Sequence, residues 1–265
     1  MGASFGWPQR IQRCRARNSR SAWSPNGMKI LVERDEDERR IRVVEHRRDG
    51  SRLYFDGGAL YTHVDAEGNN LLEYITAMDR ALRGADSVLM LGTAGGALAT
   101  LLSRRGGAVT AVDNWPAAFE IARRWFHLPT EVECIHAEAL AFLRGTPRQW
   151  SAVAIDVFHG VEIPDAFLTP DIGALLASVV QPGGLIVWNV ADCPRSWPAR
   201  WIAKALRHAG LAPTLVSVMD GEVGNTLVVC RNTRTSAFQD PAIQARRRAE
   251  LEVYSSMPRG DTPAL

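Results

Sequence analysis

The sequence predicts an α/β fold: a doubly wound, mainly parallel seven-stranded sheet with an antiparallel C-terminal edge hairpin, preceded by a small N-terminal β subdomain. Three observations carry this prediction. Apolar strand-like segments alternate with helical segments from residue 69 onward, and a glycine-rich turn at 88–96, VLMLGTAGG, ends the first of those strands. Four short strand-like segments precede residue 69 without helices between them. Strands separated by helices of this length require right-handed crossovers and therefore a mainly parallel sheet.

The small β subdomain is predicted over residues 28–68. Its last two strands meet at Asp56-Gly57-Gly58, a hairpin signal, because glycine reaches the positive φ that tight hairpins need. The predicted strands are 28–33, 41–46, 52–56 and 59–64.

The larger domain, predicted over 69–235, is where strands and helices alternate. It begins with an amphipathic helix at 69–83, for which Asn69 or Asn70 is the expected cap. The turn Asp220-Gly221 joins the last two strands and predicts the antiparallel edge hairpin. The other predicted helices are 96–104, 116–126, 138–144, 170–180 and 197–209, and the predicted strands are 87–91, 108–113, 131–135, 151–156, 184–190, 213–219 and 225–231.

The two ends of the chain differ from these domains. Residues 1–27 carry five arginines and no acid, with neither helical nor strand periodicity, and are interpreted as a disordered basic leader. A nucleic-acid arm, an organelle presequence and a translation start at Met28 are the alternatives. Residues 236–265 are expected to form a short arginine-rich helix and a tail.

Composition excludes several classes of protein. A net charge of +2 over 265 residues argues against a dedicated nucleic-acid binder. No apolar run approaches the roughly 18 residues that a membrane-spanning helix needs, so no membrane partner is expected. The four cysteines form no C-x-x-C pair, and the six histidines show no metal-ligand spacing. We therefore expect a cytoplasmic protein without a metal.

The glycine turn and Asp113 together predict a nucleoside pocket. Asp113 ends the strand that follows the turn, about 20 residues on, where an acid can bind both ribose hydroxyls. A dinucleotide fingerprint would need glycine at 92, 94 and 97, but positions 94 and 97 are Ala94 and Ala97. The looser G-x-G-x-G pattern has two of its three glycines, at 92 and 96. A tight turn without a ligand is the alternative.

Acids follow three successive predicted strands. Asp113 ends one strand, Glu138 comes just after the next, and Asp156 ends the third. Because the carboxyl ends of parallel strands meet at one edge of an open sheet, these acids are expected to share a ligand crevice. Each acid alone could equally serve as a cap or turn residue.

Between Arg52 and Asn232 the sequence resembles spermidine synthase and its spermidine synthase-like relatives, which share the class I S-adenosylmethionine-dependent methyltransferase fold. The matching segments occur in the family's order. The turn Gln181-Pro182-Gly183-Gly184 before an apolar strand is typical of this fold. The segments are LYFDGG, VLMLGTAGGALATLL, VTAVDNWPAAFEIARRWF, AVAIDVF and LTPDIGALLASVVQPGGLIVWNV.

The resemblance implies a role for each matching residue. Gly92 and Gly96 would contact the tail of the nucleoside ligand, Asp113 would bind the ribose hydroxyls, and Glu138 would accept from the adenine amino group. Asp156 would bind and deprotonate the attacking amine. An alkyl amine has a pKa near 10 and is protonated at neutral pH, so a carboxylate has to accept its proton before it can attack. The loop over 157–169 would close over the site.

The sequence also departs from the family pattern. Gly95 stands where the family has an aspartate in the glycine turn, and His159 replaces a second lid aspartate, so His159 is a candidate second base or amine ligand. Leu71 stands at the position of a family tyrosine. The family's glutamine in the β subdomain is absent, and Tyr61 and His63 lie near its place as candidate substrate-binding residues.

Three functions remain open on these grounds. The first is a transferase of polyamine biosynthesis that moves an aminopropyl group from decarboxylated S-adenosylmethionine to a small amine. The second is a methyltransferase that uses S-adenosylmethionine itself, since an acid at position 95 would repel the methionyl carboxylate. The third is a non-catalytic nucleoside-binding protein. The resemblance suggests a homodimer, and the acceptor is not specified.

Overall fold

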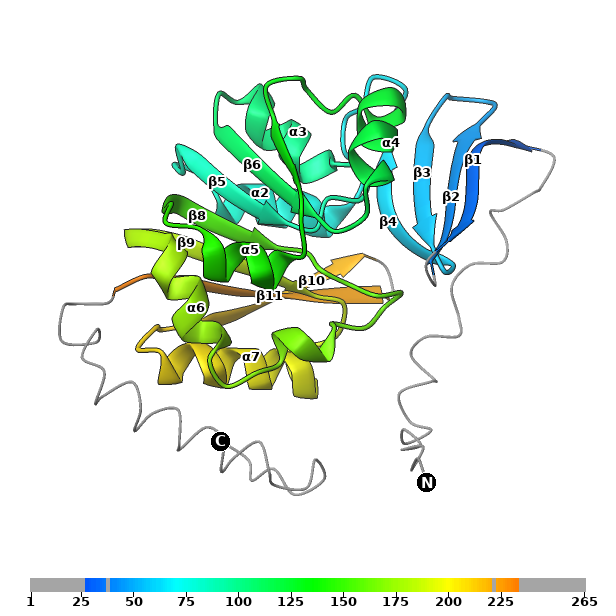
Figure 1. Cartoon of the computed structure of the whole chain (residues 1–265). Helices are drawn as coiled ribbons and strands as arrows, with labels where there is room; N and C mark the ends of the chain where they lie inside the picture. Colours follow the sequence, from blue (N-terminus) through cyan, green and yellow to red (C-terminus); the bar gives the residue numbers. More distant parts are fainter. Residues whose placement is uncertain (1–26, 37–38, 221–222, 234–265) are drawn as a thin grey trace.

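The computed structural model describes residues 27–36, 39–220 and 223–233. Apart from Gly27, the predicted leader (1–27) and the predicted C-terminal helix and tail (236–265) lie outside the described residues. The described chain forms a small antiparallel sheet beside a seven-stranded sheet that is covered by helices on both faces (Figure 1).

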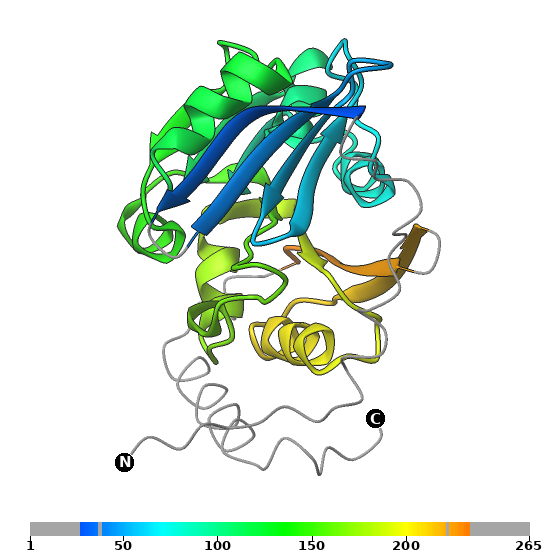
Figure 2. The same ribbon diagram turned by 90° about the vertical axis from the view of Figure 1, so that its right-hand side faces the viewer.

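The small sheet contains four consecutive antiparallel strands in the order β1-β2-β3-β4. Figure 2 shows this sheet face-on, in front of the larger sheet. One residue interrupts the pairing of the last two strands, because Tyr54 pairs with Thr62 and Phe55 with Leu60, so that Tyr61 sits in a bulge. The strands are β1 (Met28–Glu36), β2 (Arg39–His46), β3 (Arg52–Asp56) and β4 (Ala59–Val64).

The large sheet has the strand order β10-β11-β9-β8-β5-β6-β7. The pairs among β5, β6, β7, β8 and β9 are parallel, and β11 is antiparallel to both of its neighbours. This arrangement confirms the predicted fold class, including the edge hairpin. The strands are β5 (Ser87–Leu91), β6 (Ala108–Asp113), β7 (Glu133–His136), β8 (Trp150–Ile155), β9 (Val180–Val190), β10 (Thr214–Asp220) and β11 (Val223–Arg231).

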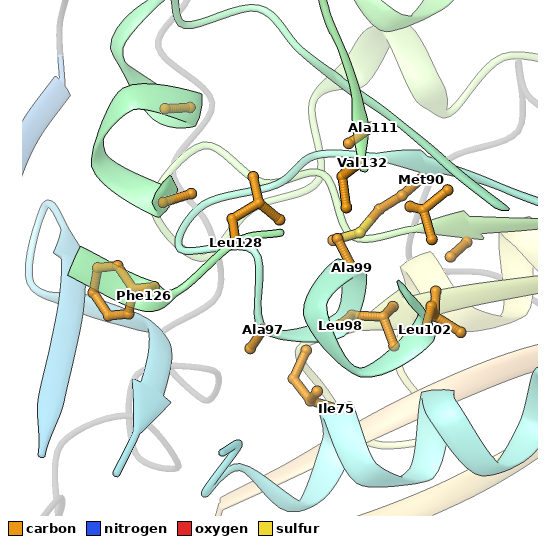
Figure 3. Close-up of a cluster of buried hydrophobic side chains, with 14 of the residues drawn as sticks. Ile75, Met90, Ala97, Leu98, Ala99, Leu102, Ala111, Phe126, Leu128 and Val132 are labelled. Atoms are coloured by element: carbon orange, nitrogen blue, oxygen red, sulfur yellow. The ribbon is translucent and has the colours of Figure 1, made fainter. Parts of the chain in front are cut away.

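Two hydrophobic clusters hold the layers together. One joins the sheet to α2, α3 and α4 and includes the inner face of the small sheet, and Figure 3 shows part of it around Met90, Leu98 and Leu102. The other joins the opposite face of the large sheet to α5, α6 and α7. The helices are α2 (Glu73–Ala81), α3 (Ala97–Arg104), α4 (Ala117–Phe126), α5 (Ala139–Gly145), α6 (Ile172–Val179) and α7 (Trp197–His208), with a 3₁₀ turn, η2, at Asp165–Phe167.

Two predicted boundaries are corrected by local hydrogen bonds. Helix α2 begins at Glu73 rather than 69, because the Asn70 side chain accepts from the Leu72 N–H and donates to the Leu72 carbonyl, a local alternative to helical pairing. Strand β9 begins at Val180 rather than 184, because the predicted turn is an irregularity within the β8–β9 pairing. A Cβ at Gly184 would lie 2.6 Å from the Ser151 carbonyl oxygen, so glycine is needed there.

The strand order places the switch point of the sheet beside β5. The chain runs from β5 to β6 and β7 on one side, then crosses to β8 and β9 on the other. In open α/β sheets, ligands bind outside the carboxyl ends of the strands at such a point. The glycine turn after β5 therefore lies between the strand ends that carry Asp113 and Asp156.

Candidate active site

A cavity of about 1120 Å³ opens at the carboxyl ends of the parallel strands. Its size exceeds that of most small-molecule sites, which occupy about 300–1,000 Å³. Six of the eight predicted site residues line it, and they come from five different segments of the chain. They are Tyr61, Gly92, Asp113, Glu138, Asp156 and His159.

The other two predicted residues, Gly96 and His63, are not among the residues that line this cavity in the described part of the chain. Gly96 caps α3 in a left-handed conformation with φ of 75°, and a Cβ there would lie 2.9 Å from Leu128 Cδ1. His63 lies opposite Leu53 on β3. Gly96 therefore shapes the glycine turn. Because of the bulge, Tyr61 lines the cavity and His63 does not.

The glycine turn is fixed by the elements on both sides of it. Gly92 has φ of 81°, and a Cβ there would collide with the carbonyl of Asp156. The Gly95 N–H donates to Thr62 Oγ1 over 3.0 Å, and a Cβ at Gly95 would lie 2.7 Å from Thr62 Cγ2. The buried Thr62 side chain therefore occupies the space that an acid at position 95 would need.

Asp113 is held by the backbone. Its Oδ2 accepts from the Thr93 N–H and its Oδ1 from the Trp115 N–H, both over 2.9 Å. The side chain is 8% exposed and borders the cavity, so the lone pairs that remain on its two oxygens are the ones available to a ligand's hydroxyls. Beside it, the Arg39 guanidinium donates to Asn114 Oδ1 over 2.8 Å at the cavity rim.

Glu138 lies two residues after the end of β7 and is the N-cap of α5. Its two carboxylate oxygens accept from the N–H groups of Leu140 and Ala141, at 3.0 and 2.7 Å, and so cap the helix. The same side chain borders the cavity. A ligand's amino group at this point would meet a carboxylate whose orientation the helix already fixes.

Asp156 is held by side chains instead. Asn189 Nδ2 donates to its Oδ1 over 2.8 Å, and the Tyr74 hydroxyl lies 3.4 Å from its Oδ2. Burial raises the pKa of Asp156 to about 6, against the lowering effect of these two hydrogen bonds. A carboxylate with that pKa is largely ionised at neutral pH and holds a proton more strongly than an exposed aspartate does.

The loop after β8 lines the same cavity as Asp156. His159 and Glu162 pair through both of their backbone groups, at 2.9 and 3.1 Å, and the Tyr61 hydroxyl donates to the Gly160 carbonyl over 2.8 Å. The loop is thereby tied to the small sheet. Burial raises the pKa of Tyr61 above its usual value, so the phenol stays a donor at neutral pH.

Sequence reasoning missed Tyr74 and Asn189. Tyr74 lies three residues after Leu71, the position where a tyrosine was sought, and contacts Asp156 from one face of α2. Helical spacing from Leu71 does not lead to it, because Leu71 lies before α2, which begins at Glu73. Asn189 is a polar residue in the apolar run of β9, and that contrast was its signal.

No family model matches the chain. In sequence, the chain is 26% identical over 205 residues to a polyamine aminopropyltransferase from Chromobacterium violaceum, covering 71% of this chain and 74% of that protein. In structure, it is similar to a probable spermidine synthase from Corynebacterium glutamicum with a TM-score of 0.64 and 17% identity, covering 89% of this chain and 98% of that one. An N-methyltransferase from Bradyrhizobium japonicum in complex with S-adenosyl-L-homocysteine gives a TM-score of 0.51 at 20% identity, covering 61% and 87%.

The chain has an α/β methyltransferase-like fold. The resemblance predicted from the motifs is confirmed, because the chain is similar in sequence to a polyamine aminopropyltransferase and in structure to spermidine synthases. No group of three histidine, cysteine, aspartate or glutamate side chains could hold a metal ion among the described residues. No helix in that part of the chain is long and apolar enough to cross a membrane.

Proposed function

We propose that the protein transfers an aminopropyl group from decarboxylated S-adenosylmethionine to a small amine, in polyamine biosynthesis. The observation that carries this proposal is that one cavity joins Asp113, placed to bind ribose hydroxyls, with Asp156, a carboxylate whose pKa is raised to about 6. The sequence similarity to a polyamine aminopropyltransferase supports it.

In the proposed reaction, Asp156 binds the acceptor as an ammonium ion and takes one proton from it. The freed amine then attacks the propyl carbon attached to the sulfonium. A C–N bond forms, the C–S bond breaks, and its electron pair stays on sulfur, so methylthioadenosine leaves. The sulfonium is already activated, and the protein's task is therefore alignment and proton removal.

We assign the other residues by their places around the cavity. Asp113 would hold the ribose and Glu138 the adenine amino group, while Gly92 and Gly96 keep the turn close to the ligand's tail. His159 lines the cavity from the loop over Asp156 and would act as a second base or amine ligand. Of the residues proposed for the acceptor, Tyr61 lines the cavity.

A donor-exchange assay tests the proposal. The protein is incubated with decarboxylated S-adenosylmethionine and 1,4-diaminobutane, 1,3-diaminopropane or a monoamine, and mass spectrometry measures methylthioadenosine and the alkylated amine. We expect both products in equal amounts. Intact S-adenosylmethionine is run in parallel, because Gly95 leaves the turn without an acid that would repel its carboxylate. Methylation of an acceptor without aminopropyl transfer would instead support the methyltransferase alternative, and tight nucleoside binding without any product a non-catalytic role.

A further inference from the structure

A chain of hydrogen bonds runs from the edge hairpin to Asp156. Asn225 on β11 donates from Nδ2 to Asn189 Oδ1 over 2.9 Å, and Asn189 on β9 donates from Nδ2 to Asp156 Oδ1 over 2.8 Å. The chain crosses three strands, β11, β9 and the end of β8, which are neighbours in the sheet. It ends on Oδ1 of Asp156, whereas the Tyr74 hydroxyl contacts Oδ2.

We propose that Asn189 and Asn225 are a positioning pair for Asp156, which fixes the carboxylate in one orientation and stabilises its ionised form. This inference deepens the proposed function, because it concerns the side chain that we assign as the base. Oδ1 accepts from Asn189, and Oδ2, which the Tyr74 hydroxyl also contacts, is the oxygen that exchanges a proton with the acceptor.

Asn189 acts through Asp156 rather than on a ligand. Its side chain is 2% exposed, and it does not appear among the residues that line the cavity. It stands in β9 between Trp188 and Val190, which are also buried. A buried amide without hydrogen-bond partners destabilises the folded state, so an amide at this position needs the two partners that it has.

Asn225 sets which end of the Asn189 amide faces Asp156. An amide presents an oxygen acceptor on one side and an N–H donor on the other. Because Asn225 donates to Asn189 Oδ1, the Asn189 N–H groups are turned toward Asp156. The reverse orientation would place an oxygen against the carboxylate and would favour the protonated acid. Asn225 is only half-buried, so it can be replaced with less risk to folding than Asn189.

Several other groups face Asp156, and the asparagine variants leave all of them in place. Tyr74 on α2 contacts its Oδ2. The other titratable or charged groups that line the cavity with it are Arg39, Tyr54, Tyr61, Asp113, Glu138, His159, Glu162 and Asp165. Since asparagine carries no charge, replacing it removes a hydrogen bond without changing the charge of the site. A change in the titration of Asp156 then reports the hydrogen-bond chain alone.

The test is the titration of the Asp156 carboxyl carbon, followed by ¹³C NMR in the full chain without ligand and assigned with Asp156→Asn. We expect Asn189→Leu to raise the pKa of Asp156 by about one unit, the worth of a hydrogen bond to a charged group. Asn225→Leu is expected to raise it by a smaller amount in the same direction. Asn232→Leu is the matched control. Asn232 is a buried asparagine just after β11, its amide donates to the Val180 carbonyl, and its replacement should leave the pKa of Asp156 unchanged.

The proposal is overturned if Asn225→Leu and Asn189→Leu leave the titration of Asp156 where the control leaves it. If Asn189→Leu does not fold, Asn225→Leu alone decides. The pH profile of kcat/KM, measured with decarboxylated S-adenosylmethionine and 1,4-diaminobutane, should show its acidic limb move by the same amount as the NMR titration. A wild-type protein without aminopropyl transfer would contradict the proposed function, and the NMR titration would still test the positioning pair.

Discussion

Asp113 and Asp156 follow strands on either side of β5, yet their carboxylates are held by different means. Both carboxylate oxygens of Asp113 accept hydrogen bonds from backbone N–H groups, those of Thr93 and Trp115. Asp156 accepts from side chains on β9 and α2, which lie far from it in sequence. Backbone donors are present in any sequence with this fold, whereas side-chain donors have to be supplied residue by residue. The side of the cavity that we propose for the nucleoside is therefore built by the fold, and the side that we propose for the acceptor by individual residues.

The largest effect is expected at the acceptor side. Asp156→Asn removes the proposed base while keeping the size of the side chain, so transfer should fall by about 10³-fold or more, and methylthioadenosine affinity should stay within a few-fold. Turnover and calorimetry on the same preparation measure the two quantities. Asp35→Asn replaces an exposed acid on β1 that does not line the cavity and is the control. An Asp156→Asn variant as active as the wild type would remove the mechanism proposed here.

A smaller effect, on binding, is expected at the nucleoside side. Asp113→Asn retains one acceptor oxygen but loses the charge, and a ligand's paired hydrogen bonds to a carboxylate are worth a few kcal/mol. We expect methylthioadenosine affinity to fall by about 10²-fold, measured by calorimetry. Circular dichroism checks that the variant still folds, because the Thr93 and Trp115 N–H groups donate to the Asp113 side chain. Unchanged affinity in a folded variant would show that the ribose lies elsewhere.

The same contrast explains what the sequence could predict. The strand ends that carry Asp113, Glu138 and Asp156 follow from apolar runs and turn spacing, and all three side chains line the cavity. Tyr74 and Asn189 could not be placed, because their contacts with Asp156 depend on how α2 packs and on the register that pairs Ile155 with Trp188. Those relations arise only when the elements assemble.

Tyr61 and His63 show a limit of strand periodicity. Both were predicted as substrate-binding residues because they lie near the place of the family's glutamine. Residues two apart on a regular strand share a face, so a regular β4 would bring both to the cavity or neither. The bulge at Tyr61 breaks that relation, since Thr62 pairs with Tyr54 and Leu60 with Phe55. The Thr62 hydroxyl then faces the glycine turn and Tyr61 reaches Gly160. A bulge of one residue leaves no clear mark in the sequence, and so this half of the site could not be derived from it.

The smallest expected effect is on stability. A carboxylate whose pKa is raised and one whose pKa is lowered should change the free energy of unfolding with pH in opposite directions. The folded-state pKa of Asp156 is raised to about 6, above the value near 3.8 of an unperturbed aspartate, by burial. Its ionisation therefore costs stability as pH rises from about 4 through 6. Asp156→Asn avoids that cost, and its free energy of unfolding relative to wild type should increase by up to about 2 kcal/mol between pH 4 and pH 8. Denaturant unfolding across this range measures it.

For Glu133→Gln, the stability relative to wild type should change with pH in the opposite direction. The hydrogen bond from Thr110 lowers the pKa of Glu133, so this carboxylate contributes stability above the pKa of the unfolded state and loses it as pH falls. Its variant should become less stable than wild type as pH rises, while Asp156→Asn becomes more stable. Parallel pH curves for the two variants would mean that Asp156 is not held in a desolvated site, and the contrast between the two sides of the cavity would then rest on Asp113 alone.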